Sequence, residues 1–315
     1  MILAFAAAPA VAKDPLLSPP LDCGADGPAC IIQQYTDNDP TEGVRDYSCG
    51  ALSYDGHKGT DFRVPTLADM EAGVTVLSAA PGTVTATRDG MPDINFRDPN
   101  APDVRNRECG NGLVINHGGG WETQYCHLKQ GSLAVSKGDR VAKGTNLGQV
   151  GLSGATEFPH VHLSVRKNGE VVDPFNPDDA SSCGVAERTL WQTTPEYISG
   201  GLLDIGFHDA VPEFQQIKAG LADPETMSTD APALVLWSYI FASQAGDQIQ
   251  FSIDGPQGWE FRDTTLLTKP QAELFRAAGK RRPPGGWPEG KFTGVVTHIR
   301  NGETLSEDVV TVTLN

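Results

Sequence analysis

His160-Val-His-Leu-Ser-Val165 has the alternation of a β-strand with one buried face. In a strand, residues i and i+2 point to the same face, and their Cα atoms lie roughly 6.6 Å apart. His160 and His162 would therefore present two imidazoles to one place. Two histidines on a solvated strand face would give the same pattern, so this pair alone does not define a site.

A second motif, His57-Lys-Gly-Thr-Asp61, adds an imidazole and a carboxylate. Its two ends can converge if a turn lies between them, and Gly59 permits a turn. Zinc is bound by histidine nitrogen and carboxylate oxygen at roughly 2.0–2.2 Å, and a catalytic zinc site keeps one position open for water. The two motifs together predict a metal site, although each by itself is a weak signal.

Two further segments predict a β-hairpin between these motifs. Residues 112–117 and 123–128 are strand-like and flank the glycine run of residues 118–120. The second of them, Thr123-Gln-Tyr-Cys-His-Leu128, contains His127. We expect the hairpin to bring His127 alongside the strand that carries His160.

Taken together and in this order, the motifs resemble those of the lysostaphin/LytM-type zinc endopeptidases, which cut peptidoglycan cross-bridges. The matching stretches are HKGTD, GNGLVINH, YCHL and HVHLSV, with a glycine-spaced run over residues 138–154. The resemblance spans about residues 50–175. One departure precedes the last motif: family members often have Ser-x-Gly-Pro-His, whereas this chain has Thr156-Glu-Phe-Pro-His160. This departure leaves the cleft wall and the substrate preference open.

The resemblance implies roles for five residues. His57, Asp61 and His162 would be the ligands of a Zn²⁺ ion, and His127 and His160 would be the catalytic pair. Strand geometry by itself does not say which of His160 and His162 binds the metal. No H-E-x-x-H motif is present, so an imidazole would have to act as the base.

The resemblance also implies a substrate, the peptide stems of peptidoglycan. A D,D-endopeptidase acting on the cross-links is the first choice, and a secreted peptidase of glycine-rich peptides is the second. Two non-enzymatic alternatives stay open. One is a LytM-like protein that binds peptidoglycan or activates an amidase; such proteins typically lack the metal ligands. The other is a wall-binding adhesin that acts through its C-terminal domain.

Composition limits the class of partner. The formal net charge of the 315 residues is −16. This charge argues against nucleic acid, whose phosphates are neutralised by Lys and Arg, and against an anionic membrane surface. No segment is long and apolar enough to span a membrane. The 35 glycines and 23 prolines indicate many turns and an all-β architecture.

Two features indicate export, to the periplasm or out of the cell. Residues 1–12 are apolar and end in Ala10-Val-Ala12, which is typical of the end of a signal peptide. The six cysteines are an even number, as in disulfide-bonded proteins of oxidising compartments. Six cysteines allow fifteen connectivities. We favour Cys109–Cys126, which flanks the hairpin, with Cys23–Cys30 and Cys49–Cys183.

The predicted organisation has a catalytic domain followed by a second β domain. After the residual signal peptide (1–12) come an irregular segment (13–49), a compact antiparallel β domain of LytM type (50–180), a linker (181–195) and an immunoglobulin-like β-sandwich (196–315). The partner of the last domain is not identifiable. Within it we expect strands at residues 234–241, 248–253, 292–299 and 309–314, and one or two helical turns over Gln271–Gly279.

Overall fold

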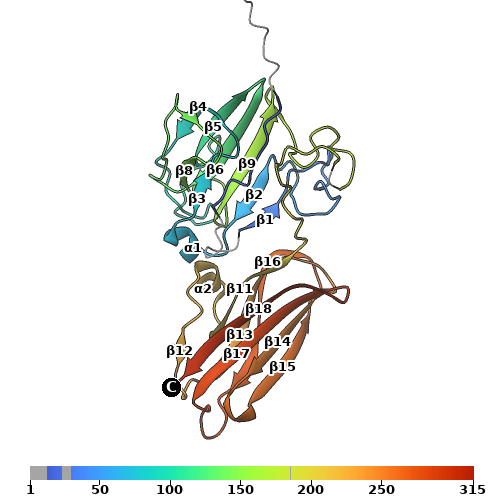
Figure 1. Cartoon of the computed structure of the whole chain (residues 1–315). Coiled ribbons are helices and arrows are strands. Elements are labelled where there is room, and N and C mark those ends of the chain that lie inside the picture. The colour runs from blue at the N-terminus through green and yellow to red at the C-terminus, as the bar shows by residue number, and fades with distance from the viewer. Residues whose placement is uncertain (1–12, 23–29, 185) are drawn as a thin grey trace, which may run out of the picture. The chain divides into compact units, whose positions relative to one another are not determined.

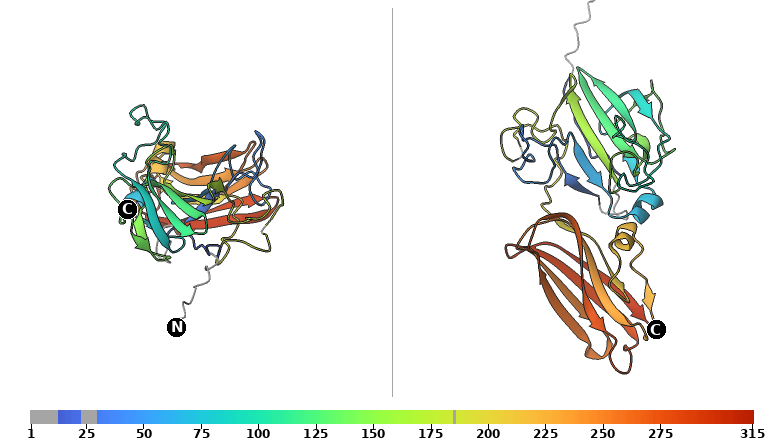
Figure 2. Two further views of the ribbon diagram at one scale, coloured as in Figure 1. Left: turned by 90° about the horizontal axis from the view of Figure 1, so that it is seen from above. Right: turned by 180° about the vertical axis from the view of Figure 1, so that it is seen from behind.

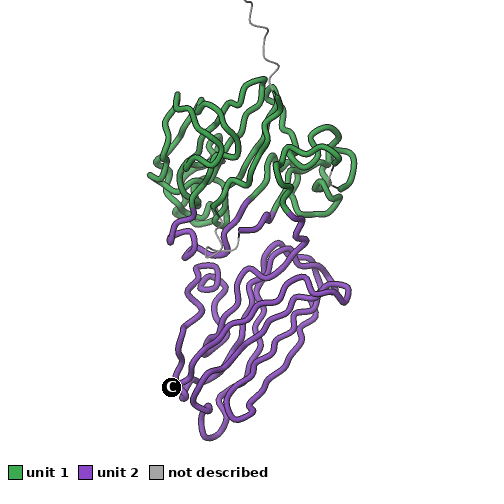
Figure 3. Tube along the Cα trace, in the orientation of Figure 1, with its two compact units in different colours: residues 1–22, 34–61, 75–195 green, residues 23–33, 62–74, 196–315 purple. Residues whose placement is uncertain are grey.

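The protein is described here by a computed structural model, which covers residues 13–22, 30–184 and 186–315. Most of its regular structure is β-strand, in agreement with the predicted all-β class (Figure 1). The chain divides into two compact units, coloured separately in Figure 3. The first comprises residues 1–22, 34–61 and 75–195, and the second comprises residues 23–33, 62–74 and 196–315.

The site is built on one large sheet with the strand order β1-β2-β9-β6-β5-β4-β7, to which β10 adds by pairing with β9. Pairings of β4 with β5 and β7, of β6 with β5 and β9, and of β9 with β10 are antiparallel. The strands are β1 (Ile31–Gln34), β2 (Thr60–Arg63), β4 (Gly82–Arg88), β5 (Asn111–Gly118), β6 (Trp121–Leu128), β7 (Arg140–Val141), β9 (His160–Lys167) and β10 (Glu170–Val171). A separate pair joins β3 (Thr75–Leu77) to β8 (Asn146–Gln149).

The predicted hairpin is confirmed as β5 and β6. Its turn uses Gly118 and Gly120 at φ values of +83° and +82°, a region that glycine enters without steric cost. Strand β6 also pairs with β9, with Cys126 opposite His162. The hairpin therefore does bring His127 alongside the strand of His160.

The C-terminal strands form two sheets, which can be followed from two sides in Figure 2. One has the order β11-β13-β16 and the other β12-β18-β17-β14-β15. These strands are β11 (Gly201–His208), β12 (Thr226–Met227), β13 (Ala233–Ser243), β14 (Gln248–Asp254), β15 (Glu260–Leu266), β16 (Gln271–Arg281), β17 (Gly290–Arg300) and β18 (Glu303–Leu314). Buried side chains from both sheets, including Phe207, Leu236, Phe251 and Phe292, share one apolar core. The arrangement is a β-sandwich; its immunoglobulin-like topology stays a prediction.

The helix expected over Gln271–Gly279 is wrong, because this segment lies in strand β16. It is rich in Ala, Glu, Leu and Arg, which favour helix locally. In the folded chain it pairs along its length with β13, for example Leu274 with Ile240 and Ala278 with Leu236. Pairing with a buried central strand overrides local propensity.

Among the described residues the α-helices are short. They are α1 (Leu67–Ala72) and α2 (Phe214–Ala219), and the sequence analysis predicted neither. Helix α1 begins with a capping box between Thr66 and Asp69, a local signal that was present in the sequence. No helix in the described part of the chain is long and apolar enough to cross a bilayer.

Two predicted disulfide bonds are confirmed, Cys49–Cys183 and Cys109–Cys126. The proposed Cys23–Cys30 bond involves Cys23, which lies outside the described residues. So does the predicted signal peptide over residues 1–12.

Candidate metal centre and catalytic histidines

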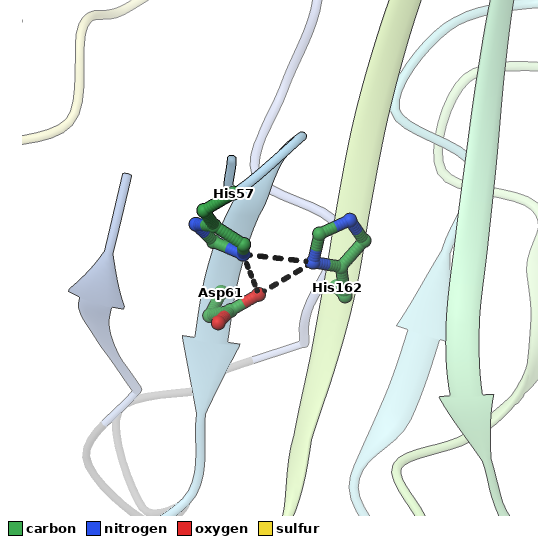
Figure 4. Close-up of side chains that lie close together, drawn as sticks. All are labelled: His57, Asp61 and His162. Carbon is green, nitrogen blue, oxygen red and sulfur yellow. Dashed lines mark hydrogen bonds and ion pairs between the residues drawn. The ribbon is translucent and has the colours of Figure 1, made fainter. Parts of the chain in front are cut away.

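Three of the predicted site residues converge where β2 and β9 lie next to each other (Figure 4). His57 Nε2 lies 3.2 Å from Asp61 Oδ1 and 3.1 Å from His162 Nδ1. His162 Nδ1 lies 2.8 Å from the same carboxylate oxygen. Two nitrogens and one oxygen from distant parts of the chain thus face one another.

Gly59 is needed here for close approach rather than for a turn conformation. A Cβ at this position would lie 2.6 Å from His162 Nε2 and 2.7 Å from the carbonyl oxygen of Leu163. Any larger residue would therefore push the His57–Asp61 segment away from β9. This requirement explains physically why glycine occupies the centre of the HKGTD motif.

The donor set fits a metal ion of the zinc type. Bonds of roughly 2.0–2.1 Å in a tetrahedral site place the ligand atoms about 3.3 Å from one another. The three donor atoms, separated by 2.8–3.2 Å, are close to this spacing. They come from two imidazoles and one carboxylate, a set found in catalytic zinc sites, which leave a further position open.

Hydrogen bonds on the outer side of each ring direct a lone pair toward this point. The carbonyl oxygen of Tyr35 can only accept, so His57 Nδ1 at 2.7 Å carries the proton and Nε2 is unprotonated. Ser164 Oγ donates to the carbonyl of Lys58 at 2.7 Å, and it accepts from His162 Nε2 at 3.0 Å. His162 Nδ1 is therefore the unprotonated nitrogen. Metal-binding histidines are typically held in this way.

Asp61 is held as a carboxylate. Asp61 is only 2% exposed, and burial by itself would raise the pKa of its carboxyl group. The neighbouring imidazoles of His57, His160 and His162, whose protonated forms attract the carboxylate, outweigh burial and bring the pKa of Asp61 well below its usual range. An ionised oxygen is the form that binds a cation.

The other two predicted residues, His127 and His160, lie next to each other beside this triad. Their ring centroids are 4.7 Å apart, and His160 Nε2 is 3.5 Å from Asp61 Oδ1. His127 Nδ1 donates to the carbonyl of Ser153 at 2.8 Å, and His160 Nδ1 donates to the carbonyl of Phe158 at 2.9 Å. In both neutral rings Nε2 is then the unprotonated nitrogen, which can accept a proton. All five predicted site residues are thus brought together.

Both rings of this pair are kept neutral by their surroundings. Burial is the largest cause that lowers the pKa of His127 well below its usual value, and repulsion between its protonated form and those of the adjacent imidazoles of His160 and His162 adds to it. Burial also lowers the pKa of His160, although Asp61 opposes this effect. Neutral imidazoles at ordinary pH are suited to accept a proton from a substrate or water.

The backbone of His127 has an unusual conformation, with φ at +63°. It lies in a β-bulge: between the pairs Asn111–Leu128 and Leu113–Tyr125, β6 has two residues where β5 has one. A left-handed conformation at a residue with a Cβ costs on the order of 1–3 kcal/mol and persists where the surroundings hold it. The bulge changes the direction of the His127 side chain from that in a regular strand. No motif in the sequence predicted the bulge.

Three side chains that touch the site were not predicted from the sequence. Ser164 holds His162, the ring of Phe158 stacks on His160 at 4.4 Å, and the ring of Tyr54 lies 4.5 Å from that of His57. Ser164 could have been found, because it is two residues beyond His162 on the same strand. Phe158 stood in the segment that departs from the family pattern.

Comparison with known proteins agrees with the motifs. Residues 55–174 match the model of Peptidase family M23. Peptidoglycan DD-endopeptidase ShyA of Vibrio cholerae is 29% identical over 136 residues, which cover 43% of this chain and 26% of the relative. DD-carboxypeptidase/endopeptidase Mpg of Neisseria meningitidis is 31% identical over 120 residues, which cover 38% of this chain and 22% of the relative. The similarity thus spans about a quarter of the length of these relatives.

A solved structure described as a zinc containing peptidase from Vibrio cholerae is similar over 55% of this chain and 41% of that one. Its sequence identity is 23% and its TM-score 0.35, so this likeness carries no argument of its own. The sequence match shows that residues 55–174 are similar to the Peptidase family M23 domain.

Proposed function

We propose that this chain, with its M23 peptidase domain, is a zinc-dependent endopeptidase that hydrolyses peptide cross-links of bacterial peptidoglycan. The observation that carries the proposal is the convergence of three ligand atoms, on His57, Asp61 and His162, beside two neutral imidazoles. A binding protein without catalysis would have no need of the second pair.

The five residues divide the chemistry. His57, Asp61 and His162 would hold the zinc ion, which when bound lowers the pKa of water and polarises the scissile carbonyl. One imidazole of the pair His127 and His160 takes a proton from the attacking water. The other, once it has itself taken up a proton at Nε2, stabilises the developing oxyanion or gives that proton to the leaving amine. Their Nδ1 anchors on backbone carbonyls keep both Nε2 atoms in position for these roles.

The D,D cross-link is the preferred scissile bond. The names of ShyA and Mpg, a DD-endopeptidase and a DD-carboxypeptidase/endopeptidase, support it. Glycine-rich peptides are the second candidate substrate. The two disulfide bonds support an oxidising location, the periplasm or the outside of the cell.

The non-catalytic alternative is a LytM-like protein that binds peptidoglycan or activates an amidase. It is less well supported, because the ligand triad and the histidine pair are both present and oriented.

The test is mass spectrometry of purified muropeptides after incubation with the zinc-loaded protein. We expect cross-linked dimers to give monomers, with a new amino group and a new carboxyl group at the D,D bond. The matched control is His57→Ala, which should leave the dimers intact. Intact dimers with the wild-type protein at full zinc occupancy would contradict the proposal, and cleavage of glycine-rich peptides alone would favour the second substrate.

A further inference from the structure

We infer that Cys109 and Cys126 are positioning residues for His127, and that turnover requires the disulfide bond between them. This inference rests on the proposed function, because it assigns the bond a role through a proposed catalytic residue. The bond joins the last residues of a long loop to the residue that immediately precedes His127.

Cys109 holds the His127 region twice. Its sulfur is bonded to Cys126, and its carbonyl oxygen accepts the backbone N–H of His127 at 2.8 Å. The covalent bond and the hydrogen bond thus fix two successive residues of β6. These two residues form the β-bulge in which His127 has its left-handed backbone.

Two further hydrogen bonds join His127 to the segment of residues 151–153. Its carbonyl oxygen accepts from the N–H of Gly151 at 3.0 Å, and its Nδ1 donates to the carbonyl of Ser153 at 2.8 Å. A left-handed conformation at histidine persists only where such contacts over-determine it. Without the disulfide bond, Cys109 would hold this part of β6 only through the hydrogen bond between its carbonyl oxygen and the N–H of His127.

The loop end at Cys109 also packs against the segment that carries Ser153. The N–H of Asn111 donates to Ser153 Oγ at 2.9 Å, and the N–H of Ala155 donates to the carbonyl of Glu108 at 2.8 Å. A Cβ at Gly110 would lie 2.3 Å from the carbonyl oxygen of Ser153. Movement of Cys109 would therefore disturb both the backbone of His127 and the acceptor of its ring.

The loop before Cys109 is held by individual hydrogen bonds, such as that from the N–H of Leu152 to Asp93 Oδ1, and not by strand pairing. Residues 89–110, all of which the structure describes, contain no strand or helix. The disulfide bond pins the C-terminal end of this loop to β6. The loss of a covalent anchor allows the loop end more conformations.

A reductant can reach the bond from one side. Cys126 is only 4% exposed, but Cys109 borders a surface pocket of about 210 Å³ that is also lined by Gln124 and Arg88. The thiolate of a dithiol reductant would attack Cys109 Sγ, and Cys126 would leave as a thiolate and take up a proton. The second thiol of the reductant would then displace Cys109, giving two protein thiols and an oxidised reductant.

The chain offers a matched control in Cys49–Cys183. This second bond lies in the same unit of the structure. Among the described contacts, neither of its cysteines forms a hydrogen bond with any of the five site residues. Its removal tests what the loss of any disulfide bond does to stability and turnover.

The experiment compares Cys109→Ser/Cys126→Ser with Cys49→Ser/Cys183→Ser, both zinc-loaded, on a soluble cross-linked muropeptide. We expect the first double variant to keep its zinc and its KM within about twofold, and to lose at least about tenfold in kcat, since small misplacements of catalytic groups have effects of this size. The control should keep kcat. Reduced wild-type protein should lose kcat and regain it on re-oxidation, with peptide mapping to identify the bond.

A second measurement does not depend on activity. Amide hydrogen exchange and imidazole NMR signals of His127 should change on reduction of wild-type protein but not in the oxidised control variant. Unchanged exchange and signals after verified reduction of Cys109–Cys126 would overturn the inference, even if the serine variant fails to fold. Wild-type kcat in the folded serine variant, or equal losses in both double variants, would also overturn it. If the wild-type protein is inactive but the His127 signals respond as expected, the proposed function fails and the positioning role stands.

Discussion

The two groups of site residues are held in different ways. The proposed ligand triad of His57, Asp61 and His162 has no left-handed backbone, and its short motifs place the donor atoms on β2, on the segment just before it and on the neighbouring strand β9. The proposed catalytic pair has a bulge with φ +63° at His127 and carbonyl anchors for both rings. The triad therefore depends on residue type and strand adjacency, whereas the pair depends on the exact course of the surrounding backbone.

Removal of a triad member should have the largest effect. In His57→Ala or His162→Ala we expect zinc to be lost and turnover to fall below detection. Only two protein ligands would remain, whereas catalytic zinc sites have three. Metal analysis and muropeptide cleavage are the measurements. His117→Ala is the control: this ring bonds to Pro81 and Thr123 and should leave zinc in place. Full zinc occupancy in both triad variants would contradict the ligand assignment.

Removal of either member of the pair should separate catalysis from metal binding. We expect His127→Ala and His160→Ala to keep zinc and to lose roughly 10²-fold or more in kcat, the usual scale for acid–base and oxyanion groups. Metal analysis on the same samples used for kinetics checks both halves. Near-normal kcat in one variant would remove that histidine from the mechanism. Loss of zinc in one variant would contradict the separation of that histidine from the metal ligands.

Ser164→Ala should weaken the triad without removing a ligand. The change deletes the acceptor of His162 Nε2, so that neither the orientation of the ring nor its tautomer is fixed by this hydrogen bond any longer. Loss of such a partner typically costs about 10–100-fold in metal affinity, to be measured by competition with a chelator. Ser181→Ala, at an exposed serine bonded to Asp179, is the control. Unchanged affinity in Ser164→Ala would show that the ring is held by strand β9 alone.

Phe158→Ala should have the smallest effect and should act on the pair. The ring stacks on His160, whose pKa is lowered mainly by burial. Exposure of the imidazole raises the pKa of His160. As the pH is lowered, His160 is then protonated at a higher pH than in the wild-type protein, so the acid limb of the kcat profile moves to higher pH. We expect kcat to fall less than about tenfold at neutral pH. Phe96→Ala, at a ring that contacts Arg97, is the control. An unshifted acid limb would argue against this role of Phe158.

Local pattern was a good guide wherever side chains repeat with the period of a strand. It predicted β9, the β5–β6 hairpin and half of the strands of the sandwich, namely β13, β14, β17 and β18. The family motifs led to all five residues that the structure brings together. It was wrong for β16, where helix-favouring residues pair with β13. It noted that Gly59 permits a turn, and the structure adds that glycine is required for the close approach of His162.

The sequence by itself determined which chemical groups are available and on which strand face they lie, because residue identity and the period of two are local properties. It thereby predicted a donor set for a metal ion and two further imidazoles. Only the tertiary structure decided which ring nitrogens face inward, since the acceptors that set the tautomers, on Tyr35, Ser153, Phe158 and Ser164, come from other segments or from backbone atoms. The left-handed backbone of His127 likewise arises from the mismatch between two paired strands, which neither strand encodes alone.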